Sequence, residues 1–410
     1  ALEENTTGSN NTAVGHAALE NGTAGSNNTG IGMASLFNTT ASNNTAVGHN
    51  SLNANTTGTQ QVAVGGQSLA NNTTGNFNQA FGYYALNANT TADYNTAVGY
   101  IALGSNTTGN FNTGLGRSAL SSNLTGAANV AVGDIALGAN TTGNNNVAMG
   151  AGALDANTTA SNNVAVGRAA LGANTTAENN VAVGDLALDA CTTSPSNTCI
   201  GANAGGSITT GNGENVCVGN NAGLGMTTGQ QNIIIGDNAC GSGTLTGNLN
   251  TVIGDNAGIN LSTGGNNTFI GGAVGNANTT ADNGTAVGKD ALLSNTTGTP
   301  NTACGSDNNT GIGRSALLAN TTGTQNTALG AFAGTAITTG NYNTLLGYVA
   351  GDALTTGGIN TAVGRAALST CITGSNNTAI GYKALDQTTA SNNTAVGTQA
   401  LEANTTRTAN

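Results

Sequence analysis

The chain of 410 residues has no tryptophan, two prolines and two histidines, and charged residues make up only 6% of it. Soluble domains usually carry about 25% charged residues, so uncharged Asn, Thr, Ser and Gly must supply the polar surface. Seven Lys and Arg against eighteen Asp and Glu give a net charge of −11. That balance argues against a nucleic-acid partner, which needs clustered basic side chains. The sequence has no run of 18 apolar residues, so it predicts no membrane span.

A repeat of 17 residues runs along the whole sequence. Its clearest marker is the glycine that follows Ala-Val in "NTAVGHAAL", which recurs at Gly15, Gly32 and Gly48 and continues to Gly397. The repeating unit reads G-x-x-A-L-x-x-N-T-T-G-x-x-N-[TV]-A-V. A period of this length is typical of solenoid proteins, in which each repeat forms one coil.

Equivalent positions of the repeat form columns, which we name by their usual residue. Relative to the marker glycine, the ladder Asn, Thr, Ala and Val columns lie four, three, two and one residues before it. The Leu column lies four residues after the marker, and the corner Asn column lies seven after it. In the unit marked by Gly150 these columns contain Asn146, Val147, Ala148, Met149, Leu154 and Asn157.

The chemistry of the columns predicts which side chains are buried. The Val column is apolar in every unit and the Leu column is mostly leucine, so we expect these two columns to form the core. The Thr and Val columns share one face of a strand, because strand side chains alternate with period two. Small residues of the Ala column lie between them, which indicates that their face meets another surface closely.

These patterns predict an all-β fold, a parallel β-solenoid (β-roll) of about 23–24 coils. Helical spacing of apolar residues is absent, and stacked coils would place each column on itself about 4.8 Å apart. Side-chain amides can then hydrogen-bond from coil to coil, as in other stacked strands. An apolar column without exception argues against the alternative, a disordered low-complexity chain. The predicted structural ladder includes Asn11, Asn28, Asn44, Asn78, Asn95 and Asn112.

The repeat divides the chain into three regions. Residues 1–198 and 288–410 are regular, the latter with a truncated coil near 305–313, where two markers are only eight residues apart. In residues 199–287, glycine mostly replaces leucine in the Leu column and bulky residues enter the Ala column. Both ends fall inside a repeat, so we predict that the chain lacks terminal caps and is a fragment of a longer one.

Two aliphatic side chains per coil stabilise it only modestly, while ordering 17 backbone residues is costly. Burial between chains would help, and the Ala column offers a flat surface for close approach. We therefore expect self-association, as a homotrimer or a filament.

The segments "NTAVGHAAL" at 11–19, "NTAVGYIAL" at 95–103 and "NTAVGRAAL" at 360–368 resemble the head repeats of YadA-like trimeric autotransporter adhesins. They are also similar to NTAVGxxAL arrays of phage tail fibres and surface fibre proteins. The resemblance implies a left-handed β-roll, three chains side by side and exposure at a cell or virion surface. The family repeat is usually shorter, and the Asn-Thr-Thr-Gly corner is an addition here.

Many Asn-X-Ser/Thr sequons lie in the corner Asn column, where a glycan could avoid the core. The alternative is that Asn-Thr-Thr-Gly serves only as turn chemistry. A second set precedes the ladder Asn by one residue, for example at Asn10, Asn27, Asn43, Asn376 and Asn392. The candidate glycosylation sites in the corner column are Asn55, Asn72, Asn89, Asn106, Asn123, Asn140, Asn157 and Asn174.

Six cysteines match no metal-binding motif. Cys199 and Cys217 share a column in adjacent coils, about 4.8 Å apart, which permits a disulfide; buried thiols are the alternative. Cys191 and Cys371 replace the corner Asn. His16 and His49 lie two coils apart, roughly 10 Å, too far to share one metal.

Together these features favour a structural shaft of an extracellular fibre, adhesin-like or tail-fibre-like, without catalysis, cofactor or metal. The alternative is a surface module that binds a glycan or a receptor. An enzyme would need a carboxylate cluster, and Asp134, Asp155 and Asp185 are spread over different coils. The binding module would use the aromatic cluster of Phe77, Phe81, Tyr83, Tyr84, Tyr94 and Tyr100.

Overall fold

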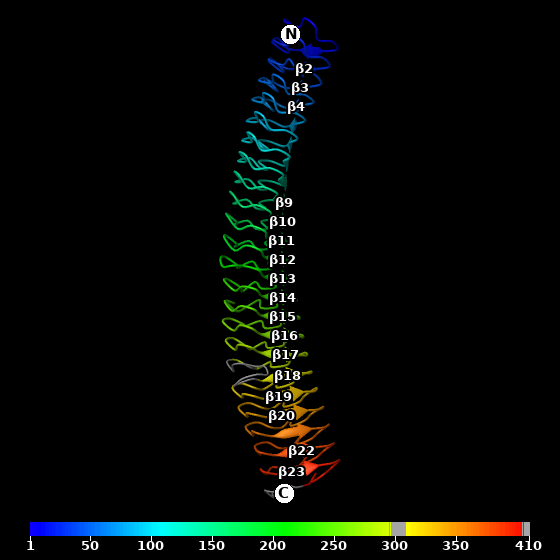
Figure 1. Ribbon diagram of the computed structural model, residues 1–410, viewed down its shortest axis with the longest axis vertical. Coiled ribbons are helices and arrows are strands. Elements are labelled where there is room, and N and C mark those ends of the chain that lie inside the picture. The colour runs from blue at the N-terminus through cyan, green and yellow to red at the C-terminus, as the bar shows by residue number, and fades with distance from the viewer. Residues whose placement is uncertain (295, 297–308, 404, 406–410) are drawn as a thin grey trace. The chain divides into compact units, whose positions relative to one another are not determined.

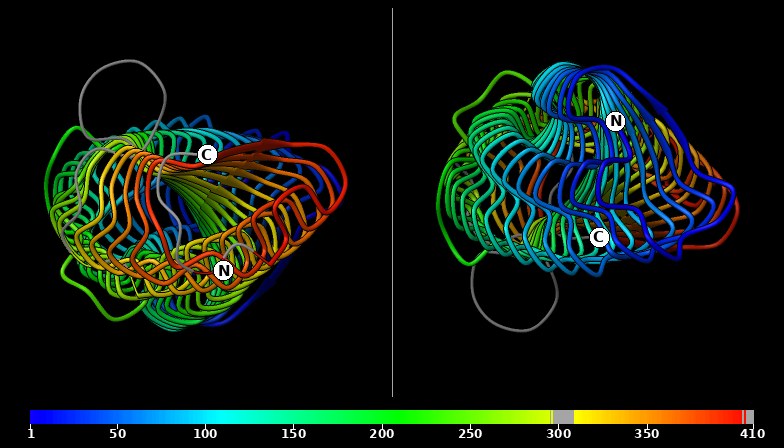
Figure 2. Two further views of the ribbon diagram at one scale, coloured as in Figure 1. Left: turned by 90° about the horizontal axis from the view of Figure 1, so that it is seen from below. Right: turned by 90° about the horizontal axis from the view of Figure 1, so that it is seen from above.

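The computed structural model describes residues 1–294, 296, 309–403 and 405. All regular secondary structure in these residues is β-strand, and the chain divides into two units, Ala1–Asn197 and Thr198–Asn410. Each unit is a parallel β-solenoid in which every turn contributes one strand of three residues (Figure 1). Seen end-on, the turns of each unit follow one another as similar loops (Figure 2). The predicted fold class is confirmed.

The first unit contains strands β1 to β11. Their bounds are β1 Thr12–Val14, β2 Thr29–Ile31, β3 Thr45–Val47, β4 Val62–Val64, β5 Gln79–Phe81, β6 Thr96–Val98, β7 Thr113–Leu115, β8 Val130–Val132, β9 Val147–Met149, β10 Val164–Val166 and β11 Val181–Val183.

The second unit contains strands β12 to β23. Their bounds are β12 Thr198–Ile200, β13 Val216–Val218, β14 Ile233–Ile235, β15 Thr251–Ile253, β16 Thr268–Ile270, β17 Thr285–Val287, β18 Thr310–Ile312, β19 Thr327–Leu329, β20 Thr344–Leu346, β21 Thr361–Val363, β22 Thr378–Ile380 and β23 Thr394–Val396.

Within each unit, neighbouring strands pair in parallel and place each column on itself. In β10 and β11, for example, Val164 pairs with Val181 and Val166 with Val183. One interval is longer, because Thr285 of β17 pairs with Thr310 of β18. The truncated coil predicted near 305–313 lies largely outside the described residues.

The interior of each turn differs from the prediction at one column. Leucines such as Leu154 are fully buried, as expected, but the buried strand residue is Ala148 of the Ala column. The Val column points outward: the exposed fraction is 57% for Val14 and 44% for Met149. The prediction that the Val column forms the core is therefore wrong. Opposite a buried leucine the turn has room only for a methyl group, so the larger residues take the outer face.

The same finding removes one argument for self-association. The Ala column was expected to offer a flat surface to a neighbouring chain, but it faces the inside of its own turn. Any contact between chains through the strands must use the Thr and Val columns instead.

The predicted ladder of asparagines is confirmed. The backbone N–H of Asn112 donates to Oδ1 of Asn95 at 2.8 Å, and its Nδ2 donates to the carbonyl of Gly126 at 2.8 Å. The backbone N–H of Asn112 thus bonds to the preceding turn and its side-chain amide bonds to the following turn. The side chain is fully buried, so these bonds satisfy polar groups that water cannot reach.

Volume is exchanged across the interior where the Leu column contains glycine. A Cβ added to Gly275 would lie 2.8 Å from the Phe269 ring, and one added to Gly223 would lie 2.7 Å from Sγ of Cys217. Gly334 and Gly351 have the same relation to Leu345, which lies outside the predicted variant region of 199–287. The exchange of volume therefore occurs wherever a bulky residue of the Ala column faces a glycine of the Leu column, in any region of the chain.

Each turn closes through backbone bends with positive φ. The marker glycines have φ between +123° and +145°, and a Cβ on Gly150 would lie 2.3 Å from the carbonyl oxygen of Gly167. Three further positions per turn are left-handed although most are not glycine, as at Leu154 with φ 52° and Asn145 with φ 57°. The left-handed conformation costs such residues roughly 1–2 kcal/mol each.

We predict that Gly150→Ala will lower the free energy of unfolding by about 3 kcal/mol, because the new methyl group would overlap the backbone of the next turn. Gly152→Ala is the matched control: Gly152 is also left-handed, but a Cβ there meets nothing within 4 Å. It should cost about 1 kcal/mol. Urea denaturation followed by circular dichroism measures both, and equal losses would contradict the close approach at Gly150.

Candidate functional site

The eight corner asparagines proposed as glycosylation sites form a second ladder inside the first unit. All eight side chains are fully buried. Nδ2 of Asn140 donates to Oδ1 of Asn123 at 2.7 Å and to the carbonyl of Gly143 at 3.0 Å. Equivalent bonds between neighbouring side chains join Asn55, Asn72, Asn89, Asn106, Asn123, Asn140, Asn157 and Asn174.

This arrangement leaves no space for a glycan at these positions, because an N-linked sugar would be attached to the same buried Nδ2 atom that makes both bonds. Turn chemistry, the alternative interpretation, is closer to what the structure shows. One signal in the sequence pointed to burial: the same column contains Ile208, Met226, Leu261 and Ile337 in other turns, and all four are buried.

The second set of sequons has the opposite environment. Asn10, Asn27, Asn43, Asn376 and Asn392 are all exposed, at the left-handed bend just before the ladder Asn. Their amides point away from the interior, so a glycan there would not disturb either ladder.

We predict that the chain, if secreted through a host that attaches N-linked glycans, will be modified only at the exposed sequons and not in the corner column. Mass spectrometry of glycopeptides measures occupancy at each site. Glycans on Asn140 or its column equivalents, in protein with an intact β-sheet spectrum, would contradict the buried ladder.

A further prediction concerns the stability that the corner ladder provides. Asn140→Ala removes two hydrogen bonds and leaves Nδ2 of Asn157 without its acceptor at Oδ1, which should cost about 1–3 kcal/mol. Exposed Ser122 is a suitable control, since Ser122→Ala should change the free energy by less than about 0.5 kcal/mol. The midpoint of urea unfolding checks both, and an unshifted midpoint for Asn140→Ala would contradict the ladder's contribution.

The cysteines that the structure describes are interior residues. Cys199 of β12 and Cys217 of β13 are register partners, as the shared column predicted, and both are buried. Cys217 is a free thiol, so no disulfide joins the pair in this structure. Burial raises the pKa of the Cys240 thiol, and the nearby Cys217 thiol adds to the increase.

Cys191 takes the place of an asparagine at the end of the corner ladder. Its Sγ donates to the carbonyl of Ser194 at 3.3 Å, which reproduces one of the two bonds of the asparagines. Burial raises the pKa of this thiol to about 11. Cys371 is a buried corner residue of the same kind. Cys304 lies outside the described residues.

The charged candidates do not gather into a site. His16 and His49 are exposed. Asp134 pairs with Arg117 at 2.7 Å and Asp185 pairs with Arg168 at 2.8 Å, all on the surface, where such pairs contribute little. Across the described ranges, no three His, Cys, Asp or Glu side chains lie close enough together to hold a metal ion.

The predicted aromatic cluster does come together around β5 and β6, and it extends to a residue that sequence reasoning missed. Phe77 stacks on Tyr94 with ring centroids 4.7 Å apart, and Tyr94 stacks on Phe111 at 5.2 Å, with interplanar angles of 3° and 7°. Phe111 occupies the same position of the repeat as Phe77 and Tyr94, which is the signal that could have identified it. On the other side of the strands, Tyr83 stacks on Tyr100 at 6.0 Å.

This stacking limits what the cluster can bind. Sugars pack their apolar C–H faces against the flat face of an aromatic ring, but Tyr94 has both faces covered by Phe77 and Phe111. Two other rings of the cluster have different environments. Tyr84 contacts Tyr83 edge to face, and Phe81 is 38% exposed on the outer face of β5. Phe77 and Phe111 at the two ends of the stack each have a ring on one face only, and Phe111 is 60% exposed. Stacking therefore reduces the flat aromatic surface open to a sugar, and the row of ring edges is suited to packing against another protein.

No protein-family model matches the chain, and no curated protein sequence matches it. In the part of the chain that the structure describes, no helix has the length and apolar character needed to cross a membrane.

Proposed function

We propose that the chain is a structural shaft of an extracellular fibre, displayed at a cell or virion surface, that associates side by side with two further copies of itself. The observation that carries the proposal is the outer face of the strands. In the described strands of each unit, this face repeats an apolar residue of the Val column and a β-branched residue of the Thr column, with Gln79 of β5 as the exception. No charged residue lies within these strands.

The exposed apolar side chains support association. Leu115 of β7, Met149 of β9, Leu329 of β19 and Leu346 of β20 are each between 41% and 44% exposed. Continuous apolar surface of this kind typically marks a site of protein contact. Many of its residues are Val, Ile or Thr, whose side chains have few rotamers, so ordering them at an interface costs little entropy.

The positions of the charged residues also support this face as the contact surface. The ion pairs Arg117–Asp134 and Arg168–Asp185 begin one residue after the marker glycine, so they flank the strands instead of interrupting them. The edge-on stack of Phe77, Tyr94 and Phe111 continues the uncharged surface on the other side. A flat uncharged strip with a charged margin resembles the core and rim of a protein interface.

The alternative, a glycan-binding module centred on the aromatic cluster, receives less support because the rings cover one another.

The implied threefold assembly follows the resemblance to adhesin head repeats, with the Thr and Val columns in place of the Ala column as the contact surface.

We predict that the triple variant Val98→Lys, Val132→Lys, Val166→Lys will lose self-association, since three charges would lie on the outer face in alternate turns. Sedimentation equilibrium should give the parent protein about three times the chain mass of 39.6 kDa and the variant a single chain mass.

The matched control is Thr108→Lys, Thr142→Lys, Thr176→Lys, which places the same charges in alternate turns at exposed corner positions. This control should keep the mass of the parent. A parent protein that sediments as a single chain, or a face variant that keeps the parent mass, would contradict the proposal.

A further inference from the structure

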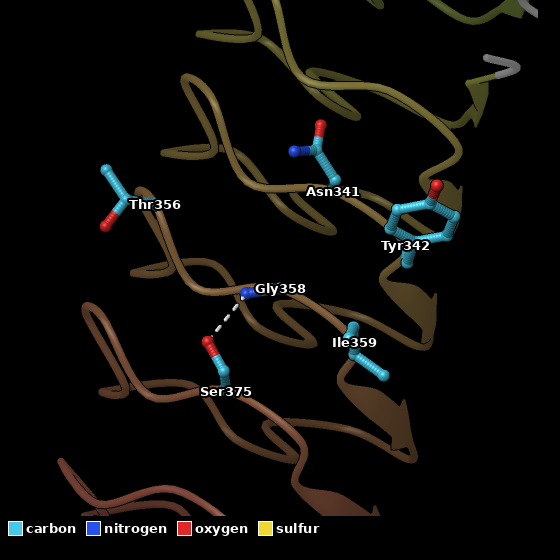
Figure 3. Close-up of a pocket in the computed structure, with 6 residues that line it drawn as sticks. All are labelled: Asn341, Tyr342, Thr356, Gly358, Ile359 and Ser375. Atoms are coloured by element: carbon cyan, nitrogen blue, oxygen red, sulfur yellow. Dashed lines mark hydrogen bonds between the residues drawn. The ribbon is translucent and has the colours of Figure 1, made fainter.

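A surface pocket in the second unit has the features of a small ligand site. Its volume is about 320 Å³, within the range of roughly 300–1,000 Å³ that ligand pockets occupy. Three successive turns line it, and none of the lining residues is charged (Figure 3). The lining residues are Asn341, Tyr342, Thr356, Gly358, Ile359 and Ser375.

The pocket exists because Gly358 interrupts a third polar ladder. Six residues before the marker glycine, a short polar side chain often accepts the backbone N–H of the preceding turn. The Oδ1 atom of Asn341 accepts from Thr324 N–H at 2.7 Å, and Oγ of Ser375 accepts from Gly358 N–H at 3.1 Å. Gly358 has no side chain to accept in the same way from Asn341.

The interruption leaves hydrogen-bond donors at the pocket. The backbone N–H and the Nδ2 group of Asn341 donate to no partner among the described residues. Thr356 and Ser375 also line the pocket, and Figure 3 shows these residues in the two turns that follow Asn341.

An open aromatic ring lies beside these donors. Tyr342 is 57% exposed and Ile359 is 60% exposed. The Tyr342 ring stacks on no other aromatic ring in the described part of the chain, unlike Tyr94, which has both faces covered. Its column neighbours are the non-aromatic residues Gln325 and Ile359, so no second aromatic ring competes with a ligand for the Tyr342 side chain.

We propose that this pocket binds a neutral saccharide. A pyranose combines an apolar C–H face, which would pack against Tyr342 and Ile359, with hydroxyl oxygens that would accept from the backbone N–H and Nδ2 of Asn341. The hydroxyl groups of Thr356 and Ser375 can donate to or accept from the remaining sugar hydroxyls. The absence of charge from the lining favours a neutral sugar over an ionised ligand.

The test is saturation-transfer NMR on the full chain with the methyl glycosides of glucose, galactose, mannose and N-acetylglucosamine as probes. At least one glycoside should receive saturation, and titration gives its affinity. Tyr342→Ala should weaken that affinity about tenfold or more through loss of the ring contact. Gly358→Ser restores a side-chain acceptor for Asn341 N–H, fills the pocket, and should abolish binding.

Two variants serve as controls. Gly265→Ser makes the same change at the equivalent position of another turn, where a Cβ would likewise meet the carbonyl oxygen of the preceding turn, that of Asn248. Tyr94→Ala removes an exposed ring from the aromatic stack. Both should keep the affinity of the parent. Absence of saturation transfer to every glycoside, or an unchanged affinity in Tyr342→Ala with an intact β-sheet spectrum, would overturn the proposal.

Discussion

Exact stacking of each turn on the next is the constraint on which the rest of the structure depends. Because register partners are equivalent residues, as in the pairing of Val164 with Val181, each side chain must tolerate a similar one about 4.8 Å away. Stacked like charges would repel each other, whereas an amide both donates and accepts and can therefore repeat in every turn. This explains why only 6% of residues are charged and why asparagine lines both interior ladders.

Two different combinations of side chains fill the interior of the turns, and individual residues show where one combination changes to the other. One combines alanine, leucine and a corner asparagine; the other combines a bulky strand residue, glycine and an aliphatic corner, as in Leu345, Gly351 and Leu354. The corner ladder ends where a turn of one combination follows a turn of the other. Nδ2 of Asn278 has no partner in the structure, because the preceding corner residue is Leu261.

The period of the repeat was sufficient to predict the parallel solenoid and the ladder from Asn95 to Asn112. It could not show which strand face is inside, because both faces contain apolar residues. The usual preference for burying the larger residue gave the wrong answer, since Leu154 already fills the space opposite Ala148. The burial of the corner asparagines could not be predicted from their sequons, because a sequon does not report burial. The pocket at Gly358 depends on a missing side chain beside a ring from the previous turn, a neighbourhood that only the three-dimensional structure reveals.

The left-handed bends give each turn a shape that its own sequence disfavours. A leucine with φ near +52°, as at Leu154, is held there by hydrogen bonds from the neighbouring turns, such as the bond from its N–H to the carbonyl of Ala170. A turn that loses a neighbour loses part of this support and keeps the whole conformational cost. Unfolding should therefore advance turn by turn from any exposed end or break, so the solenoid resists disruption along its middle and is weakest wherever stacking stops.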